Sequence, residues 1–266
     1  MNTDDFWSLI ERAQQVADPQ NEASMMEALF WELTKLTDRD FFAWYRLQEA
    51  FMQLADTPKL CAAAAIINYG TSDDRFMDFR AWLVMQGRAV YLSALAAPDR
   101  LARMRVPFGE AEWELCGYIA MYAYTGRKYL ALFRPDAPDG QALRRRYPDC
   151  KDLPQQVERI CMARALIRPL HVGGFDQDLD HQMLQTEIEY RLRRSKVPKD
   201  FFAALHKDEP KEDLAEELAK TLTIDTEKVD PTVPHPLPAL WQKRTDWEAG
   251  RLQYQSGSTH REPATR

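Results

Sequence analysis

The residues whose types and spacing could support chemistry gather in one segment, from Ser72 to Arg88. Carboxylates and an arginine lie close together there, and such groups can hold a metal ion or grip a polar ligand. The residues that stand out are Ser72, Asp73, Asp74, Asp78, Arg80, Trp82 and Arg88. One interpretation is therefore a ligand pocket around residues 72–80.

The same residues also fit a structural role. Ser72 is typical of a helix N-cap, and Asp73 and Asp74 would follow it in the first turn, where the helix dipole favours carboxylates. Asp73 and Arg80 are seven residues apart, so they share a helix face two turns from each other. We favour this interpretation, with Asp73 at a helix start and Arg80 tied to a neighbouring helix or to a backbone carbonyl. No general acid or base can be assigned.

Other catalytic and metal-binding patterns are missing from the sequence. His181 and Asp178 have helical spacing, but a lone histidine among carboxylates on a polar helix is more typical of a solvated surface. The four cysteines form no C-x-x-C pair, and G-x-S-x-G, G-x-x-x-x-G-K and H-E-x-x-H are all absent. We assign no catalytic residue, predict no metal site and no cofactor, and favour a protein that is not an enzyme.

The charge and hydropathy of the sequence limit the classes of binding partner that we expect. The formal net charge is −6, which opposes binding to phosphate backbones, and the run at residues 144–146 is better explained as a solvated loop cluster than as a nucleic-acid contact. No stretch approaches the roughly 18 to 20 apolar residues that a membrane helix needs, and the first residues are acidic rather than basic. We expect a cytoplasmic protein that binds neither nucleic acid nor membrane.

The elements that must position these residues are helices throughout. Apolar residues recur at three- and four-residue steps from the N-terminus to Gly126, which is placed to end the last helix of this part. The segment 60–67, LCAAAAII, is apolar almost all round and predicts a central helix, with Gly70 at its C-terminal cap. We predict an all-α fold in which residues 1–127 form a compact, bundle-like domain.

The composition of the sequence changes after this domain. Prolines, glycine and the basic run predict a loop, after which helical patterns return, so residues 128–225 read as further helices in a separate subdomain or an extension. Residues 226–266 are predicted to form an extended to disordered tail, because prolines are frequent early in this stretch and its end has little to bury.

The segment that carries the chemistry also carries a family resemblance. The pattern S-D-D-x-F-x-x-F-R-x-W-L-x-x-Q-G-R begins at Ser72, and a P-D-x-L-A element begins at Pro98. With the opening Phe6-Trp7 and the run before Gly70, this part of the chain resembles the bacterial family of domains of unknown function numbered 4240. The resemblance covers roughly residues 1–126 and implies a helical domain without implying an activity. One departure is the run 68–71, Asn-Tyr-Gly-Thr, where the family has glycine-glycine-cysteine, which alters any pocket there.

Three functional hypotheses from different classes remain open. The first is a non-catalytic protein-binding protein, such as an immunity protein that occludes a cognate bacterial toxin, because an acidic helical scaffold with surplus aromatic residues suits an interface. The second is an enzyme or small-ligand sensor with a polar pocket around residues 72–80. The third is a regulatory or assembly module whose C-terminal arm serves as the docking element.

Overall fold

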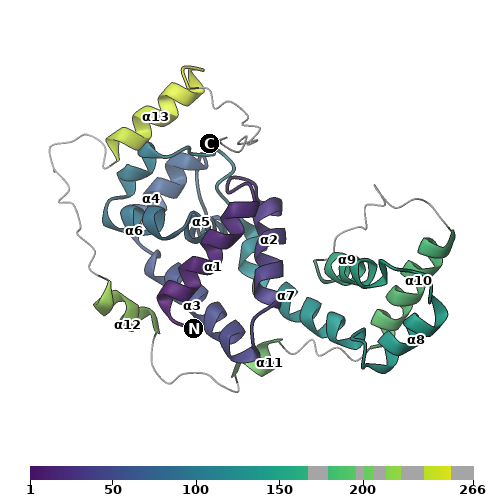
Figure 1. The fold of residues 1–266 in the computed structure, drawn as a ribbon. Coiled ribbons are helices and arrows are strands. Elements are labelled where there is room, and N and C mark those ends of the chain that lie inside the picture. The colour runs from purple at the N-terminus through teal and green to yellow at the C-terminus, as the bar shows by residue number, and fades with distance from the viewer. Residues whose placement is uncertain (167–178, 196–200, 207–213, 223–236, 253–266) are drawn as a thin grey trace, which may run out of the picture. The chain divides into compact units, whose positions relative to one another are not determined.

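The computed structural model describes residues 1–166, 179–195, 201–206, 214–222 and 237–252. Every regular element among them is a helix, so the predicted all-α class is confirmed (Figure 1). In the first part of the chain the helices are α1 (Thr3–Val16), α2 (Glu22–Thr34), α3 (Asp38–Leu54), α4 (Pro58–Ile67), α5 (Asp73–Met85), α6 (Arg88–Ala96) and the 3-10 helix η1 (Pro98–Arg103). They are followed by α7 (Glu114–Leu132), α8 (Pro138–Arg146), α9 (Leu153–Ala165), α10 (Leu179–Arg194), α11 (Phe201–His206), α12 (Leu214–Thr221) and α13 (Pro238–Glu248). Within the described part of the chain, no helix combines the length and hydrophobicity that crossing a bilayer requires.

By its internal contacts the chain divides into two compact units, each built from two stretches of sequence. Unit 1 comprises residues 1–46 and 117–213, and unit 2 comprises residues 47–116 and 214–266. The division falls inside α3 and inside α7. The domain boundaries expected at residues 127 and 225 are placed where the composition and the helical pattern of the sequence change, not from contacts. They stay a prediction.

The core of unit 1 begins at the N-terminus. Asn2 caps α1 through a capping box, since its side chain accepts from the N–H of Asp5 at 2.8 Å while the carboxylate of Asp5 accepts from the N–H of Asn2 at 3.0 Å. The cap fixes where the apolar face of α1 starts. That face buries Phe6, whose ring stacks on Trp44 of α3 with the ring centroids 5.5 Å apart.

Gly126 does not end a helix, contrary to the sequence prediction, because α7 continues through it to Leu132. A Cβ atom at position 126 would lie 2.3 Å from the ring of Phe30 in α2, so only glycine permits this approach. The close packing offsets the roughly 1 kcal/mol that glycine costs inside a helix. The glycine serves packing here rather than termination.

A second apolar cluster of unit 1 lies among α8, α9 and α10. It includes Leu143, Ile160 and Ile188, all buried. The arginines at 144–146 occupy the last turn of α8 rather than the loop that the sequence predicted. That position is favourable because the C-terminal end of a helix attracts positive charge.

The core of unit 2 contains α4, as the apolar segment predicted. Ala64 is fully buried, and α4 packs against α5, η1 and α13. In the same unit the hydroxyl of Tyr91 donates to the carbonyl of Phe51 at 2.7 Å, which satisfies the polar end of a buried aromatic side chain.

The C-terminal part of the chain differs from the expected extended course at one place. Residues 238–248 form α13, with Pro238 in its first turn, where a fixed φ and the missing N–H are tolerated. Leu237 and Leu240 are buried against unit 2. The rest of the predicted tail, residues 226–236 and 253–266, lies outside the described residues.

Candidate functional site

The signature segment forms the start and body of α5. Ser72 caps the helix, because its hydroxyl accepts from the N–H of Arg75 at 3.4 Å. Asp73 and Asp74 lie in the first turn and are exposed, where they can interact with the positive end of the helix dipole. Their placement is accounted for by the helix start alone.

Arg80 ties α5 to the end of α3. Its guanidinium donates to the carbonyl of Met52 at 3.2 Å and lies 3.1 Å from the carboxylate of Asp56. The same group lies over the ring of Phe76, 5.0 Å from the ring centroid, and the side chain is 15% exposed. Its Nε is buried without a hydrogen-bond partner among the described residues. The arginine therefore has a clear packing role at the boundary of the core.

The remaining signature residues do not converge on one point. Trp82 is fully buried in the core, whereas Arg88 is exposed at the start of α6. Asp78 is half-buried, and burial raises the pKa of its carboxyl, with Glu114 and Glu112 adding like charge. Among the described residues, no group of three or more metal-ligating side chains could hold a metal ion. A ligand pocket in this segment stays a prediction.

A second candidate site, which the predicted site residues do not include, lies in unit 2 where α13 meets η1. The carboxylate of Asp99 accepts from two backbone N–H groups at the start of α13, from Ala239 at 3.1 Å and from Leu240 at 2.8 Å. Leu237, at the N-cap position of α13, provides no side-chain hydrogen bond of its own. Asp99 therefore performs the capping of α13 from a distant part of the sequence.

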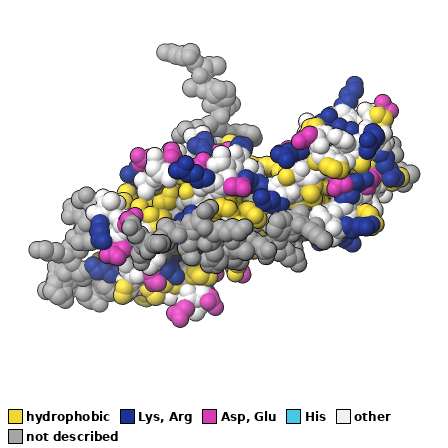
Figure 2. Space-filling view, turned by 90° about the horizontal axis from the view of Figure 1, so that it is seen from below, with side chains coloured by type: hydrophobic (Ala, Val, Ile, Leu, Met, Phe, Trp, Pro, Cys, Tyr) yellow, Lys and Arg dark blue, Asp and Glu magenta, His cyan; other side chains and the backbone are white. Residues whose placement is uncertain are grey.

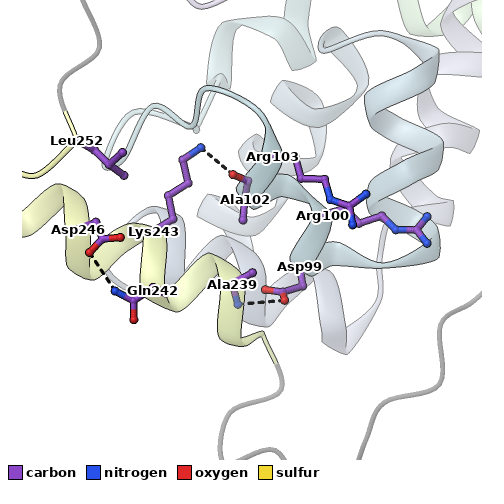
Figure 3. A pocket seen from close by; sticks show the side chains of 9 residues that line it. All are labelled: Asp99, Arg100, Ala102, Arg103, Ala239, Gln242, Lys243, Asp246 and Leu252. Carbon is purple, nitrogen blue, oxygen red and sulfur yellow. Dashed lines mark hydrogen bonds between the residues drawn. The ribbon is translucent and has the colours of Figure 1, made fainter.

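A lysine reinforces this contact from the other side. The ammonium group of Lys243 donates to the carbonyl of Ala102 in η1 (Figure 3). It also donates to the carbonyl of Met104, the residue that follows η1. Between η1 and α13 lies an open cavity of about 500 Å³, which is lined mainly by charged and polar residues together with Ala102, Ala239 and Leu252. Figure 3 shows the side chains of Arg100 and Arg103 extending away from α13, so the cations around this cavity do not converge on a common ligand position.

Next to the cap, an arginine lies between two aromatic side chains. Arg244 of α13 lies 4.3 Å from the centroid of the Tyr69 ring and 5.4 Å from that of Trp241. It also donates to the carbonyl of Ile66 and pairs with Glu248 at 2.8 Å. Tyr69 and Trp241 are 46% and 45% exposed. We call Tyr69, Arg244 and Trp241 the aromatic-arginine cluster.

The backbone at Tyr69 is unusual. The end of α4 has the hydrogen bond of a Schellman motif, from the N–H of Gly70 to the carbonyl of Ala65 at 2.8 Å. In this motif the left-handed residue is usually glycine, but here Tyr69 adopts it, with φ +59°. The predicted cap at Gly70 is thus displaced by one residue. A tyrosine in this conformation costs on the order of 1–3 kcal/mol, which the surrounding packing must offset.

Only part of this second site left a signal in the sequence. Pro238 before the apolar run Ala239-Leu240-Trp241 is a helix-start pattern, but the prolines that precede it favour an extended tail. The partner, Asp99, is about 140 residues away. No local pattern connects the two.

Comparison with known proteins finds a family match for the first part of the chain. The model of one family, described as protein of unknown function (DUF4240), matches residues 1–126. No curated protein and no solved structure matches the chain. The matched range includes all of α5 and η1, together with Tyr69, and excludes α13. The match confirms the predicted resemblance of the first 126 residues to the DUF4240 family.

Proposed function

We propose that this protein is a non-catalytic protein-binding protein that acts by covering a surface of its partner. The observation that supports this proposal best is the aromatic-arginine cluster of unit 2. Tryptophan, tyrosine and arginine are the residue types most enriched among the side chains that dominate binding energy at protein interfaces. Here one of each lies side by side, with both rings about half exposed.

The cluster is held in place before any partner arrives. Arg244 is fixed by Glu248 and by the carbonyl of Ile66, and Tyr69 by the Schellman turn at the end of α4. Side chains that are already ordered lose little conformational entropy on binding, so more of their contact energy is available for affinity. The strained backbone of Tyr69 has a use in this proposal, because it presents the ring to Arg244.

The charge distribution supports a partner of opposite charge only weakly. The net charge of −6 favours association with a basic protein. Figure 2, however, shows basic and acidic side chains interspersed on the visible face rather than gathered into one acidic patch. Affinity would therefore come mainly from buried anchors, with charge contributing to the rate of association.

For the identity of the partner, we propose a cognate bacterial toxin, which makes this chain an immunity protein that occludes an active site. This narrower proposal is supported by the acidic charge, which suits masking a site built for anionic substrates. It is tested by expressing the product of the neighbouring gene in cells with and without this protein, and by mixing the two purified proteins. Rescue from toxicity together with one-to-one co-elution supports occlusion. Rescue without a complex contradicts it and indicates an enzyme that reverses the damage.

The interface itself is tested by single substitutions. Trp241→Ala should weaken the complex at least about tenfold, as expected for a central anchor. Tyr190→Ala is the matched control, because Tyr190 is also an exposed aromatic residue of a helix but lies in α10 of unit 1. Equal effects of the two substitutions would show that the cluster is not the interface.

A specific observation also favours the third hypothesis, a regulatory or assembly module with a C-terminal docking element. The described C-terminal helix α13 does dock, and it docks on η1 and α4 of its own chain. The ligand-pocket hypothesis gains no comparable support, because Ser72 caps α5 and the guanidinium of Arg80 is engaged by Met52 and Asp56.

A further inference from the structure

The surface that receives α13 is a continuous part of the region matched by the DUF4240 model. Its contact groups come from the end of α4, from η1 and from residues 103–109, all within residues 1–126. The helix that covers this surface begins at residue 238, far outside that region. Receptor surface and occupant are therefore two separate pieces of the sequence. We call the surface the α13 receptor.

The polar chemistry of the α13 receptor is that of hydrogen-bond acceptors. The carboxylate of Asp99 accepts hydrogen bonds from two backbone N–H groups at the start of α13. Three backbone carbonyls accept hydrogen bonds from the basic side chains of α13. These carbonyls belong to Ile66, Ala102 and Met104. Such a rim selects a helix whose N-terminus has no cap of its own and whose second turn carries basic residues.

The apolar part of the contact is small. Within α13 only Leu240 is buried, at 0% exposed, and Leu237 is buried just before the helix. Trp247 adds a ring contact with Phe108, with centroids 5.9 Å apart, but is itself only half-buried. A helix held by two leucines, one aromatic contact and a polar rim resembles a bound ligand more than a core element.

We propose that the α13 receptor is a helix-binding site and that α13 is its reversible ligand within the same chain. The helix leaves and returns as a unit while the rest of the protein stays folded. A separate helix of the same sequence binds in its place. The ligand class is a helix with an uncapped start, leucine at its third position, lysine and arginine at its sixth and seventh, and an aromatic residue at its tenth.

Release of α13 would also disassemble the aromatic-arginine cluster, because Arg244 and Trp241 both belong to α13. Occupancy of the receptor thereby controls whether these anchors are presented next to Tyr69. The inference does not depend on the proposed function, since the site and its ligand are both parts of this chain. Its test contains no other protein, so the two proposals fail separately.

The test uses the full chain and a labelled peptide of residues 237–252. In the variant Leu240→Asp the chain's own α13 loses its buried anchor, which vacates the receptor. The peptide should bind this variant at micromolar concentrations, measured by fluorescence anisotropy. It should also gain helical circular dichroism on binding, because an isolated 11-residue helix is marginal in water. A peptide that itself carries Leu240→Asp is the matched control and should not bind.

Two further chains sharpen the result. The wild-type chain should bind the peptide about 100-fold more weakly than the variant, because its tethered helix competes at a millimolar effective concentration. Adding Asp99→Ala to the Leu240→Asp chain should weaken peptide binding about five- to tenfold through the lost cap.

Three outcomes would overturn the inference. The first is that the Leu240→Asp chain loses its far-ultraviolet circular dichroism and cooperative melting, which would make α13 part of the core. The second is that this chain stays folded but does not bind the peptide. The third is equal binding to the wild-type chain and to the variant, which would show that the peptide contacts some other surface.

Discussion

Two helices of unit 2, α5 and α13, show contrasting ways of being held. α5 buries seven of its thirteen residues, among them Phe79 and Trp82. α13 buries only Leu240 of its eleven residues and is fixed by hydrogen bonds that it donates to acceptors on the receiving surface. Most signature residues of the sequence thus lie on α5, a helix of the core, whereas the exposed anchors lie around a helix that is only lightly buried. Distinctive sequence and accessible chemistry are found in different places.

This difference sets expectations for perturbations. A change in the core around α4 and α5 should affect the stability of the whole unit, because many buried contacts are lost together. A change at α13 should act locally, since few apolar contacts hold it.

The largest effect is expected from Ala64→Asp in α4. Ala64 is fully buried, and a carboxylate there would have no partner, so the loss should be about 3–5 kcal/mol or complete unfolding. Thermal melting followed by circular dichroism measures it. Lys59→Asp is the control, because residue 59 is exposed in the first turn of the same helix, where an acidic residue is favourable. A wild-type melting curve for Ala64→Asp would show that α4 is not a core helix.

The next effect is expected from Arg80→Ala. It removes the donor to the carbonyl of Met52 and the partner of Asp56, and the stability loss should be about 2 kcal/mol, measured by denaturant unfolding. Arg88→Ala, at an exposed arginine of α6, should stay within about 0.5 kcal/mol of the wild type. If Arg80→Ala abolished a measured activity and left stability unchanged, the ligand-pocket hypothesis would replace the structural one.

A smaller effect tests the strained residue beside α13. Tyr69→Gly relieves the left-handed backbone but loses the ring under Arg244, whereas Tyr69→Ala loses the ring and keeps the strain. The glycine variant should therefore be about 1 kcal/mol more stable than the alanine variant, by thermal melting. Equal stability of the two variants would mean that Tyr69 is not strained in solution.

The smallest effect concerns pH and Asp78. Burial, with Glu114 and Glu112 nearby, raises the pKa of this carboxyl above its ordinary value of 3.8. Between the ordinary and the raised pKa the folded chain holds a proton that the unfolded chain has lost, so stability falls as pH rises through this interval. Asp78→Asn removes that cost and should stabilise the protein slightly at pH 7, because solvent screens much of the interaction of a half-exposed carboxyl. The gain should vanish near pH 3, where the aspartate is protonated, and melting curves at the two pH values measure it.

Much of the helical framework could be predicted from the sequence because its determinants are local. Asn2 and Ser72 lie within one turn of the backbone N–H groups that they cap, so a few neighbouring residues define those helix starts. The composition of the apolar run in α4 likewise predicts by itself that this helix is buried.

What the tertiary structure decided depends on groups that are distant in sequence. Gly126 permits contact with Phe30 of another helix, so its function could not be told from that of a helix-ending glycine. The cap of α13 is supplied by Asp99, about 140 residues away. Arg244 of α13 lies over the ring of Tyr69, which belongs to the turn after α4. Periodicity and caps report on one turn of chain, whereas a binding surface arises only when folding brings separate segments together.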